Sequence, residues 1–260
     1  MILVREWDAA EYEKLSAPMT GWGAWIVGRL DLRGDEAAID AGCGTGRVTE
    51  VLLERLPRGS VLAVDSSAAM VEATRKRFAG EPRVRVERQD LSSLEVREPV
   101  DLILSTATFH WINDHDRLFG RLALALKPHG RLVAQCGGEG NISRATRAVG
   151  EAMREEPFRP YFEGWQDDKY YADPPSTKAR LEAAGFEEVE AWLHEEVVPF
   201  DTAEELSRYL GAIVLGGHVA RLPEELREPF TTGVAEKMVA LDGKPVLDYV
   251  RLNIQARKSA

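Results

Sequence analysis

The sequence lacks the features that mark several large classes of protein. Its 260 residues include two cysteines, Cys43 and Cys136, which belong to no CxxC pair or Cys/His cluster, so neither a disulfide framework nor a metal site is indicated. No apolar run approaches the roughly 20 residues that a transmembrane helix needs. The opening MILVREWDAAEYEKL becomes charged after four residues and does not read as a secretory signal. We therefore expect a cytoplasmic protein.

Basic residues are also in deficit. The chain has 33 Lys and Arg against 43 Asp and Glu, a formal net charge of −10. This charge opposes phosphate backbones and anionic lipid, and it disfavours a nucleic-acid or membrane partner. A small-molecule substrate is the partner that we expect, and nothing in the sequence distinguishes a monomer from a dimer. A composition of 44% hydrophobic and 29% charged residues is typical of one compact domain.

The chain from residue 36 to 135 alternates short β-branched runs with longer amphipathic ones. Strands are predicted at residues 37–40, 60–65, 84–90, 101–105 and 130–136, and helices at 47–56, 68–78 and 115–127. This alternation predicts right-handed crossovers and a parallel sheet with helices on both faces, an α/β fold. Farther on, helices are predicted at 142–154, 202–215 and 222–241, and residues 177–200 read as a helix ending at Gly185 followed by a long strand. The alternating run 246–258 suits an antiparallel strand near a sheet edge.

A glycine-rich loop follows the first predicted strand. In IDAGCGTG, residues 39–46, Gly42, Gly44 and Gly46 form a tight turn that lets backbone approach a ligand closely. The spacing G-x-G-x-G differs from the G-x-G-x-x-G of dinucleotide sites, and Asp40 is a poor neighbour for a pyrophosphate. An acid at this position suits a cationic ligand, such as the α-amino group of a methionine moiety.

Two more acids follow at the ends of the next strands. Asp65 is placed to accept both hydroxyls of a ribose, a role that it shares with the acids of NAD sites. Ser66 or Ser67 caps the next helix, and the Met70 thioether can lie against an adenine face. Asp90, which ends the third strand, is placed to accept from an adenine amino group. The order of these marks favours S-adenosylmethionine over NAD.

The stretch 35–136 resembles the class I S-adenosylmethionine-dependent methyltransferases through IDAGCGTG, AVDSSAAM, RQDL and LKPHGRLV, in that order. STATFHWINDHDRLF, with WDAAEYEKLS, YYADPPSTKARLEAAGF and DYVRLNIQARK, is similar to the trans-aconitate methyltransferase group and to the related malonyl-carrier-protein and juvenile-hormone-acid methyltransferases. The resemblance implies a Rossmann-like, mostly parallel seven-stranded sheet whose last strand is antiparallel. Within a single domain, 1–260, it implies a cofactor-binding core at 34–137, a substrate cap from 1–33 and 138–245, and a closing strand at 246–258.

The motifs give a set of candidate site residues. Those expected to bind the cofactor are Tyr12, Asp40, Gly42, Cys43, Gly44, Asp65, Ser66, Met70, Asp90, Leu91 and Ser105. Trp7 is expected to face the ligand beside Tyr12. His110 and Trp111 follow the fourth strand, at the carboxyl edge where open α/β sheets bind ligands. His110 reads as a substrate hydrogen-bond donor, a general base or an ordinary loop histidine, and Trp111 as a substrate-positioning or a packing residue. His115 reads as a helix-surface residue.

The nature of the methyl acceptor decides whether a base is needed. A carboxylate is ionised at pH 7 and needs none, whereas an amine, hydroxyl or carbon usually must lose a proton. Because His110 is the only well-placed base, carboxyl O-methylation of an organic acid is favoured, as it is by the resemblance. The alternatives are an N-, C- or other O-methyltransferase with His110 as base, an NAD-dependent oxidoreductase, and a non-catalytic cofactor-binding module.

One further motif invites a different interpretation. DPPS, residues 173–176, is similar to a signature of nucleic-acid amino-methylating enzymes, but it follows the fifth strand and lacks the aromatic residue. We interpret it as a turn that starts a helix.

Overall fold

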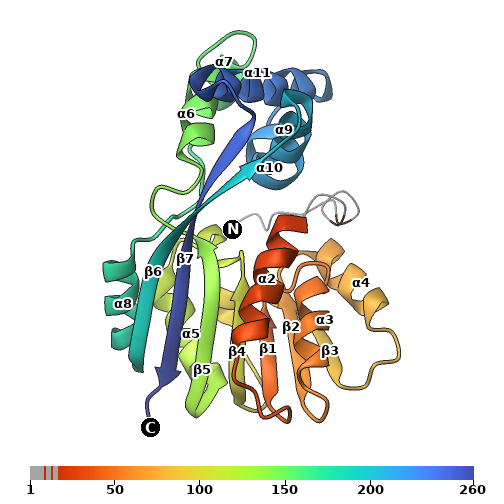
Figure 1. Ribbon diagram of the computed structural model, residues 1–260, viewed down its shortest axis with the longest axis vertical. Coiled ribbons are helices and arrows are strands. Elements are labelled where there is room, and N and C mark those ends of the chain that lie inside the picture. The colour runs from red at the N-terminus through yellow and green to blue at the C-terminus, as the bar shows by residue number, and fades with distance from the viewer. Residues whose placement is uncertain (1–8, 10–12, 14–16) are drawn as a thin grey trace.

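The computed structural model describes Ala9, Glu13 and residues 17–260. A seven-stranded sheet runs through its lower half in the order β3-β2-β1-β4-β5-β7-β6 (Figure 1). Strands β1 to β5 are parallel, and β7 runs antiparallel to both of its neighbours, β5 and β6. The predicted α/β sheet with an antiparallel last strand is thus confirmed. The strands are β1 (Ala37–Ala41), β2 (Ser60–Asp65), β3 (Val84–Arg88), β4 (Val100–Thr106), β5 (Leu126–Gly137), β6 (Phe186–Pro199) and β7 (Val246–Lys258).

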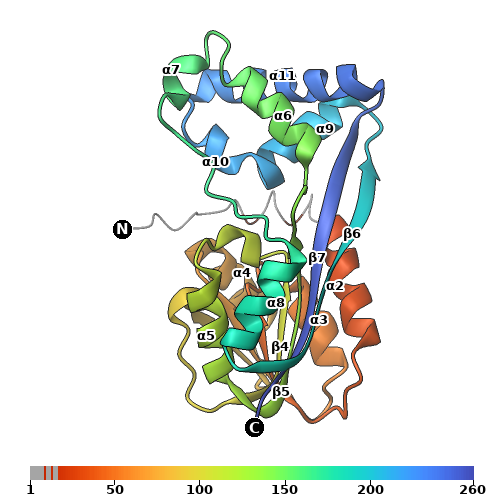
Figure 2. The ribbon, with the colours of Figure 1, turned by 90° about the vertical axis from the view of Figure 1, so that its left-hand side faces the viewer.

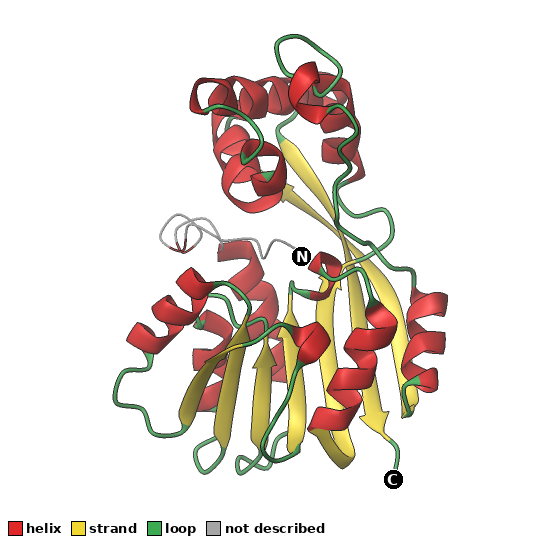
Figure 3. Ribbon diagram, turned by 180° about the vertical axis from the view of Figure 1, so that it is seen from behind, coloured by secondary structure: helices red, strands yellow, loops and turns green. Residues whose placement is uncertain are grey.

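Helices cover both faces of this sheet (Figure 3). Successive strand residues point to opposite faces, so Ala38 and Leu102 pack in the cluster of α2 and α3, whereas Ile39 and Ile103 pack in that of α5 and α8. We call the sheet and the helices that cover it the base. These helices are α2 (Ala17–Arg29), α3 (Arg47–Glu54), α4 (Ala68–Arg77), α5 (His115–Ala125) and α8 (Pro174–Ala183), with short 3₁₀ turns η1 (Leu91–Ser93) and η2 (Phe109–Trp111).

A second group of helices lies above the carboxyl ends of the parallel strands, and β6 and β7 rise into it (Figures 1 and 2). Its members are α6 (Ser143–Ala152), α7 (Arg159–Phe162), α9 (Ala203–Tyr209), the π-helical turn η3 (Leu210–Val214), α10 (Gly216–Val219) and α11 (Glu224–Asp242). We call this group the upper helices. They have their own buried cluster, which includes Phe230, Val234 and Met238.

The range 138–245, expected to form a cap, is divided between the two parts of the molecule. Helix α8 and the first half of β6 belong to the base, where α8 packs on β6 and α5. That the upper helices cover a substrate remains a prediction. None of the helices that the structure describes is long and apolar enough to cross a bilayer.

Two of the element boundaries that differ from the prediction have a clear cause in the hydrogen bonding. Helix α5 ends at Ala125 and β5 starts at Leu126, because Val100 pairs with Leu126 ahead of a bulge that carries the KPHG segment. The helical run predicted at 202–215 changes pitch after Tyr209, where the Leu215 N–H donates to the Leu210 carbonyl at 2.7 Å. The DPPS turn starts α8 as predicted, since the Asp173 carboxylate accepts the Ser176 N–H at 2.8 Å.

Candidate cofactor and substrate site

The glycine loop lies between β1 and α3, at the carboxyl edge of the sheet. Gly42, Gly44 and Gly46 have φ values of +86°, +55° and +83°, in the left-handed region. A Cβ on Gly42 would lie 2.0 Å from Oγ1 of Thr108, a residue of the segment after β4. The loop therefore needs glycine at residue 42 both for its backbone conformation and for this close approach.

The amides of the loop are already hydrogen-bonded within the protein. The Gly42 and Cys43 N–H groups donate to the Val64 carbonyl at 2.8 and 2.9 Å, and the Gly44 N–H donates to Oδ2 of Asp65 at 3.0 Å. These bonds fix the loop against the end of β2. A contact between these three residues and a cofactor would then come from their carbonyl groups and Cα atoms, and the assignment of Gly42, Cys43 and Gly44 remains a prediction.

Asp40 is a buried acid next to a second acid. Its side chain is 1% exposed and accepts a hydrogen bond of 2.6 Å from Oγ1 of Thr49, and among the described residues no basic side chain pairs with it. Burial, and then the nearby Asp65 carboxylate, raise the pKa of Asp40 to about 6 against the opposing effect of the Thr49 hydrogen bond. Two adjacent carboxylates of this kind fit a cationic ligand and oppose a pyrophosphate.

Asp65 is oriented by backbone donors. Its Oδ1 accepts the Ser67 N–H at 2.9 Å, and its Oδ2 accepts the Gly44 N–H. Ser67, and not Ser66, caps α4, because Oγ of Ser67 accepts the Met70 N–H at 3.4 Å. The carbonyl of Ser66 accepts from Nε of Arg88 at 2.8 Å, and Met70 is 2% exposed. Asp65 is thus held at the end of β2, where a ribose hydroxyl pair was expected.

The remaining cofactor candidates help to build the same edge of the sheet. Asp90 is exposed, and its Oδ1 caps η1 by accepting the Ser92 N–H at 2.8 Å. The Leu91 side chain packs in the sheet core, and Oγ of Ser105 donates to the Ala41 carbonyl at 2.6 Å. A cofactor contact at Leu91 or Ser105 would therefore use backbone atoms, and both assignments remain predictions.

Neither cysteine is set up as a nucleophile. Burial, together with the Asp40 and Asp65 carboxylates, raises the pKa of the Cys43 thiol. Burial also raises the pKa of Cys136 to about 12. Both thiols stay protonated at neutral pH, which suits Cys43 as a small residue in a tight loop.

His110 is held from several sides in η2, just past the end of β4. Its ring is 8% exposed, its Nδ1 accepts the Gly137 N–H at 3.3 Å, and its carbonyl accepts the Tyr170 N–H at 3.0 Å. The ring also stacks on Tyr171, with centroids 5.9 Å apart. Because Nδ1 is the acceptor, the hydrogen of the neutral ring is on Nε2, which makes His110 a donor at that atom.

Trp111 lies beside His110, with ring centroids 4.9 Å apart. Nζ of Lys169 lies 5.3 Å from the centroid of the Trp111 ring, and the same ammonium pairs with Asp167. The charge of Lys169 is therefore matched by a carboxylate beside the predicted substrate position.

His115 does not lie on the surface as predicted. It is 2% exposed, and its ring packs against Phe119 and Tyr170 at centroid distances of 5.3 and 5.0 Å. The turn at η2 folds the start of α5 inward, and Nε2 of His115 bonds the Phe109 carbonyl at 3.1 Å.

Trp7 and Tyr12 lie outside the described residues. Their described neighbour Glu13 accepts from Nε of Arg47 at 2.8 Å and from Nη2 of Arg77 at 2.6 Å, and it also accepts from the Thr45 hydroxyl. Glu13 thus contacts the glycine loop and the first residue of α3 as well as α4.

Sequence reasoning missed a buried cation in the same region. Arg251 in β7 is 3% exposed, and its Cζ lies 4.5 Å from the ring centroid of Trp22 and 5.8 Å from that of Tyr249. The alternating pattern of residues 246–258, predicted as a strand near a sheet edge, suggests that the Arg251 side chain faces solvent. It is buried because β6 pairs along the outer side of β7 and α2 carries Trp22 over it.

Comparison with known proteins gives the family of the chain. The profile of a family described as a methyltransferase domain matches residues 38–130. A trans-aconitate 2-methyltransferase of Rhizobium etli is 30% identical over 97% of this chain and 99% of its own length. One of Methylobacterium nodulans is 31% identical over 72% of this chain and 67% of its own length.

Solved structures show the same fold at lower identity. The YcgJ protein of Bacillus subtilis has a TM-score of 0.62 at 15% identity, over 94% of this chain and 99% of its own. A phosphoethanolamine N-methyltransferase of Haemonchus contortus, solved with phosphomonomethylethanolamine and S-adenosylhomocysteine, has a TM-score of 0.59 at 20% identity, over 92% of this chain and 53% of its own. With the near full-length match to the Rhizobium etli enzyme, these findings establish that the chain belongs to the class I S-adenosylmethionine-dependent methyltransferases, in the trans-aconitate 2-methyltransferase group.

Proposed function

We propose that this enzyme methylates a carboxylate of a small organic acid, and that trans-aconitate is the first acceptor to test. The observation that carries the proposal is the near full-length similarity to enzymes named for that acid. The tautomer of His110 supports it, because a ring with its hydrogen on Nε2 donates to a carboxylate but does not take a proton from an amine or hydroxyl at that atom.

The cofactor fits the acids at the carboxyl edge. S-adenosylmethionine supplies, when bound, an activated methyl group on a positively charged sulfur. Asp40 would neutralise its α-amino group, and Asp65, held by two backbone N–H donors, would accept from its ribose hydroxyls. Asp90 would accept from its adenine amino group, with Met70 against the adenine face. The proposed roles of these side chains are binding and orientation.

The acceptor would be positioned by groups on the other side of the edge. A carboxylate is ionised at pH 7, so this chain needs no base and has to supply alignment and a dry cavity. The Nε2–H of His110 would donate to the acceptor carboxylate, and Trp111 would form an apolar wall beside it. The upper helices, with the N-terminal segment, would exclude water.

A labelled-methyl screen over carboxylic acids, amines and phenols tests the proposal. We expect transfer to trans-aconitate and label that is released by mild alkali, as from a methyl ester. Label that resists alkali, or transfer to amines or phenols alone, would contradict carboxyl methylation.

Two substitutions at residue 110 separate a donor from a base. His110→Gln keeps an N–H donor and removes a titrating group, whereas His110→Ala removes both. If His110 is a donor, the Gln variant keeps most of kcat/KM and the Ala variant loses about 10- to 100-fold, the value of one hydrogen bond to a charged group. Equal loss in both variants, with a wild-type rate that depends on a group of pKa near 6.5, would instead make His110 the base.

A further inference from the structure

Arg251 is a buried guanidinium that has no matching anion among the described residues. Its Nε donates to Oε1 of Gln135 at 3.4 Å, and the rings of Trp22 and Tyr249 lie beside its guanidinium group. It makes no ion pair with any described residue, and its two terminal nitrogens make no hydrogen bond to the part of the chain that the structure describes. Glu196 of β6 influences it electrostatically but lies beyond ion-pair distance.

A buried guanidinium is stable in its charged form when an anion pairs with it. Buried ionised groups in proteins are paired because desolvation costs several kcal/mol per ion. An arginine also presents a planar fork of donors that matches the two oxygens of a carboxylate. Nε is already bonded to Gln135, so the fork that remains is the pair of terminal nitrogens.

Arg251 lies close to the proposed acceptor position. In the register of β5 and β7 it is opposite Gly137, the residue whose N–H donates to Nδ1 of His110. A Cβ on Gly137 would lie 2.7 Å from Cε1 of Tyr171, and the Tyr171 ring stacks on His110. Gly137 thus places Arg251, Tyr171 and His110 around one point at the carboxyl end of β5.

We propose that Arg251 binds a second carboxylate of the acceptor, one that is not methylated, so that the enzyme selects acids with two or more carboxylates. The inference rests on the proposed carboxyl methylation. The carboxylate in the fork is not the reacting one, because two charge-assisted hydrogen bonds would hold both of its oxygens and lower its nucleophilicity. Lys169, a second cation of this region, is already paired with Asp167. In a chain of net charge −10, a cation that no described acid pairs is also what would attract a polyanion.

The test begins with binding, measured by calorimetry on the complex of the full chain with S-adenosylhomocysteine. Arg251→Met removes the charge at similar volume, and Arg251→Lys keeps the charge but loses the fork. Arg257→Met is the matched control, since Arg257 is on the same strand, is 42% exposed and pairs with Glu188. We expect the Kd for trans-aconitate to rise about 100-fold in Arg251→Met and less in Arg251→Lys, and to stay unchanged in Arg257→Met.

A comparison of acceptors tests the same inference through the substrate. A dicarboxylate such as succinate and its half-amide differ in the carboxylate that Arg251 would bind. We expect the wild-type enzyme to prefer the diacid in kcat/KM and the Arg251→Met variant to lose that preference. If Arg251 were only structural, its loss would lower the melting temperature and S-adenosylhomocysteine affinity while the preference for the diacid stayed.

The outcomes separate this inference from the proposed function. Methylation of diacid and half-amide at equal rates, or unchanged Kd values in Arg251→Met, would overturn the Arg251 assignment and leave carboxyl methylation standing. If no acid accepted the methyl group but polycarboxylates still bound through Arg251, the anion site would stand and the proposed reaction would fail. A wild-type complex that bound no polycarboxylate would overturn the inference outright.

Discussion

At the scale of single residues, we expect Asp40 to link cofactor affinity to pH. With a pKa of about 6 in the ligand-free protein, Asp40 is largely protonated below that pH. A cationic group binds the ionised form, so we expect the Kd for S-adenosylhomocysteine to be flat from pH 7.5 to 6.5 and to rise about tenfold per pH unit below 6. Calorimetry between pH 4.5 and 7.5 measures this slope.

Asp40→Asn is the companion variant, because an amide oxygen can still accept from Thr49. It should bind S-adenosylhomocysteine weakly and without the change of slope near pH 6. An acid whose folded-state pKa is raised contributes stability at low pH and loses it as pH rises through 6. The ligand-free variant at pH 7 should therefore be more stable than the wild type, by up to about 3 kcal/mol. If the ligand-free variant unfolded at a lower denaturant concentration than the wild type at pH 7, this explanation would be wrong.

Gly42 offers a second prediction at this scale. Alanine there would meet Thr108 at 2.0 Å and would also need a φ of +86°. Gly80 is the control, since its φ is +89° and a Cβ would meet nothing within 4 Å. We expect Gly80→Ala to cost about 1 kcal/mol and Gly42→Ala about 3 kcal/mol or more, from chemical denaturation. Only Gly42→Ala should also lose S-adenosylhomocysteine binding, and equal costs in the two variants would contradict the close packing of the loop.

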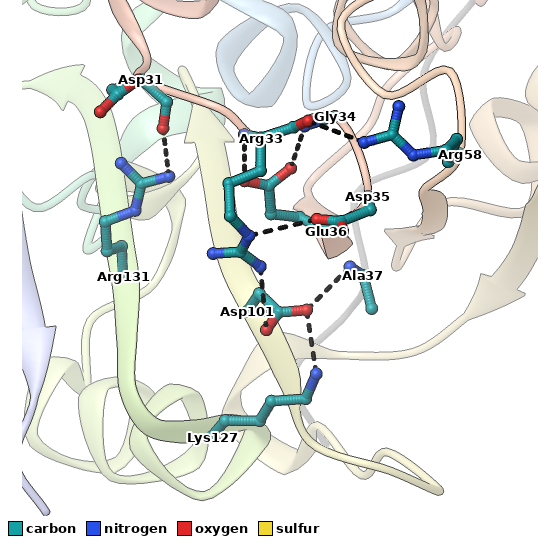
Figure 4. Close-up of polar contacts among 10 residues, drawn as sticks. All are labelled: Asp31, Arg33, Gly34, Asp35, Glu36, Ala37, Arg58, Asp101, Lys127 and Arg131. Atoms are coloured by element: carbon teal, nitrogen blue, oxygen red, sulfur yellow. Dashed lines mark hydrogen bonds and ion pairs between the residues drawn. The ribbon is translucent and has the colours of Figure 1, made fainter.

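At the scale of elements, a network of charges ties the lower ends of β1 and β4 together, away from the site (Figure 4). Asp101 accepts the Ala37 N–H and Nζ of Lys127, both at 2.9 Å, and Nη2 of Arg33 lies 3.9 Å away. Burial works to raise the pKa of Asp101, but the Lys127 and Ala37 hydrogen bonds outweigh it, so the pKa is lowered. The ionised Asp101 carboxylate therefore stabilises the fold at pH values above the usual pKa of an aspartate, near 4. This stabilisation is lost as the pH falls through the lowered pKa.

Asp101→Asn should therefore lower the free energy of unfolding by about 1 kcal/mol at pH 7 and leave it unchanged near pH 2. Urea unfolding at the two pH values measures the difference. Asp35→Asn is the control, because the Asp35 carboxylate pairs with Arg33 while 49% exposed and should contribute little at either pH. An Asp101 effect that persists at pH 2 would mean that the charge is not its origin.

A site residue can be predicted from the sequence when its position depends on a local strand pattern, and not when it depends on the pairing of distant elements. Asp40, Asp65 and His110 each end or follow a strand with its own local pattern, so their place at one edge of the sheet follows from parallel topology alone. Arg251 and Tyr171 have no such local mark. Arg251 is buried because β6, a partner from far along the chain, pairs outside β7, and Tyr171 reaches His110 only because the chain descends again from α7.

At the scale of the whole molecule, the base and the upper helices have separate hydrophobic clusters. The chain passes between them after β5, after α7, and along β6 and β7 (Figure 2). The acids proposed to bind the cofactor, Asp40, Asp65 and Asp90, lie on the base alone. The Arg251 region touches both parts, because Tyr249 beside Arg251 also bonds Tyr209 of α9 through a hydroxyl pair at 2.7 Å.

Hydrogen exchange should resolve this division. In the ligand-free protein, amides of α6 and α11 should exchange faster than those of β1 and β4, which lie in the middle of the sheet. S-adenosylhomocysteine at 100 times its Kd should slow sub-global opening of the base about 100-fold and leave the upper helices little changed.

Adding trans-aconitate should then slow amide exchange in α9 and at the start of β7, because the acid would link Arg251 to the pair of tyrosines above it. The trimethyl ester of the acid, which has no charge for Arg251, should not. Slower amide exchange in α9 with S-adenosylhomocysteine alone would instead mean that the cofactor brings the two parts together before the acceptor binds.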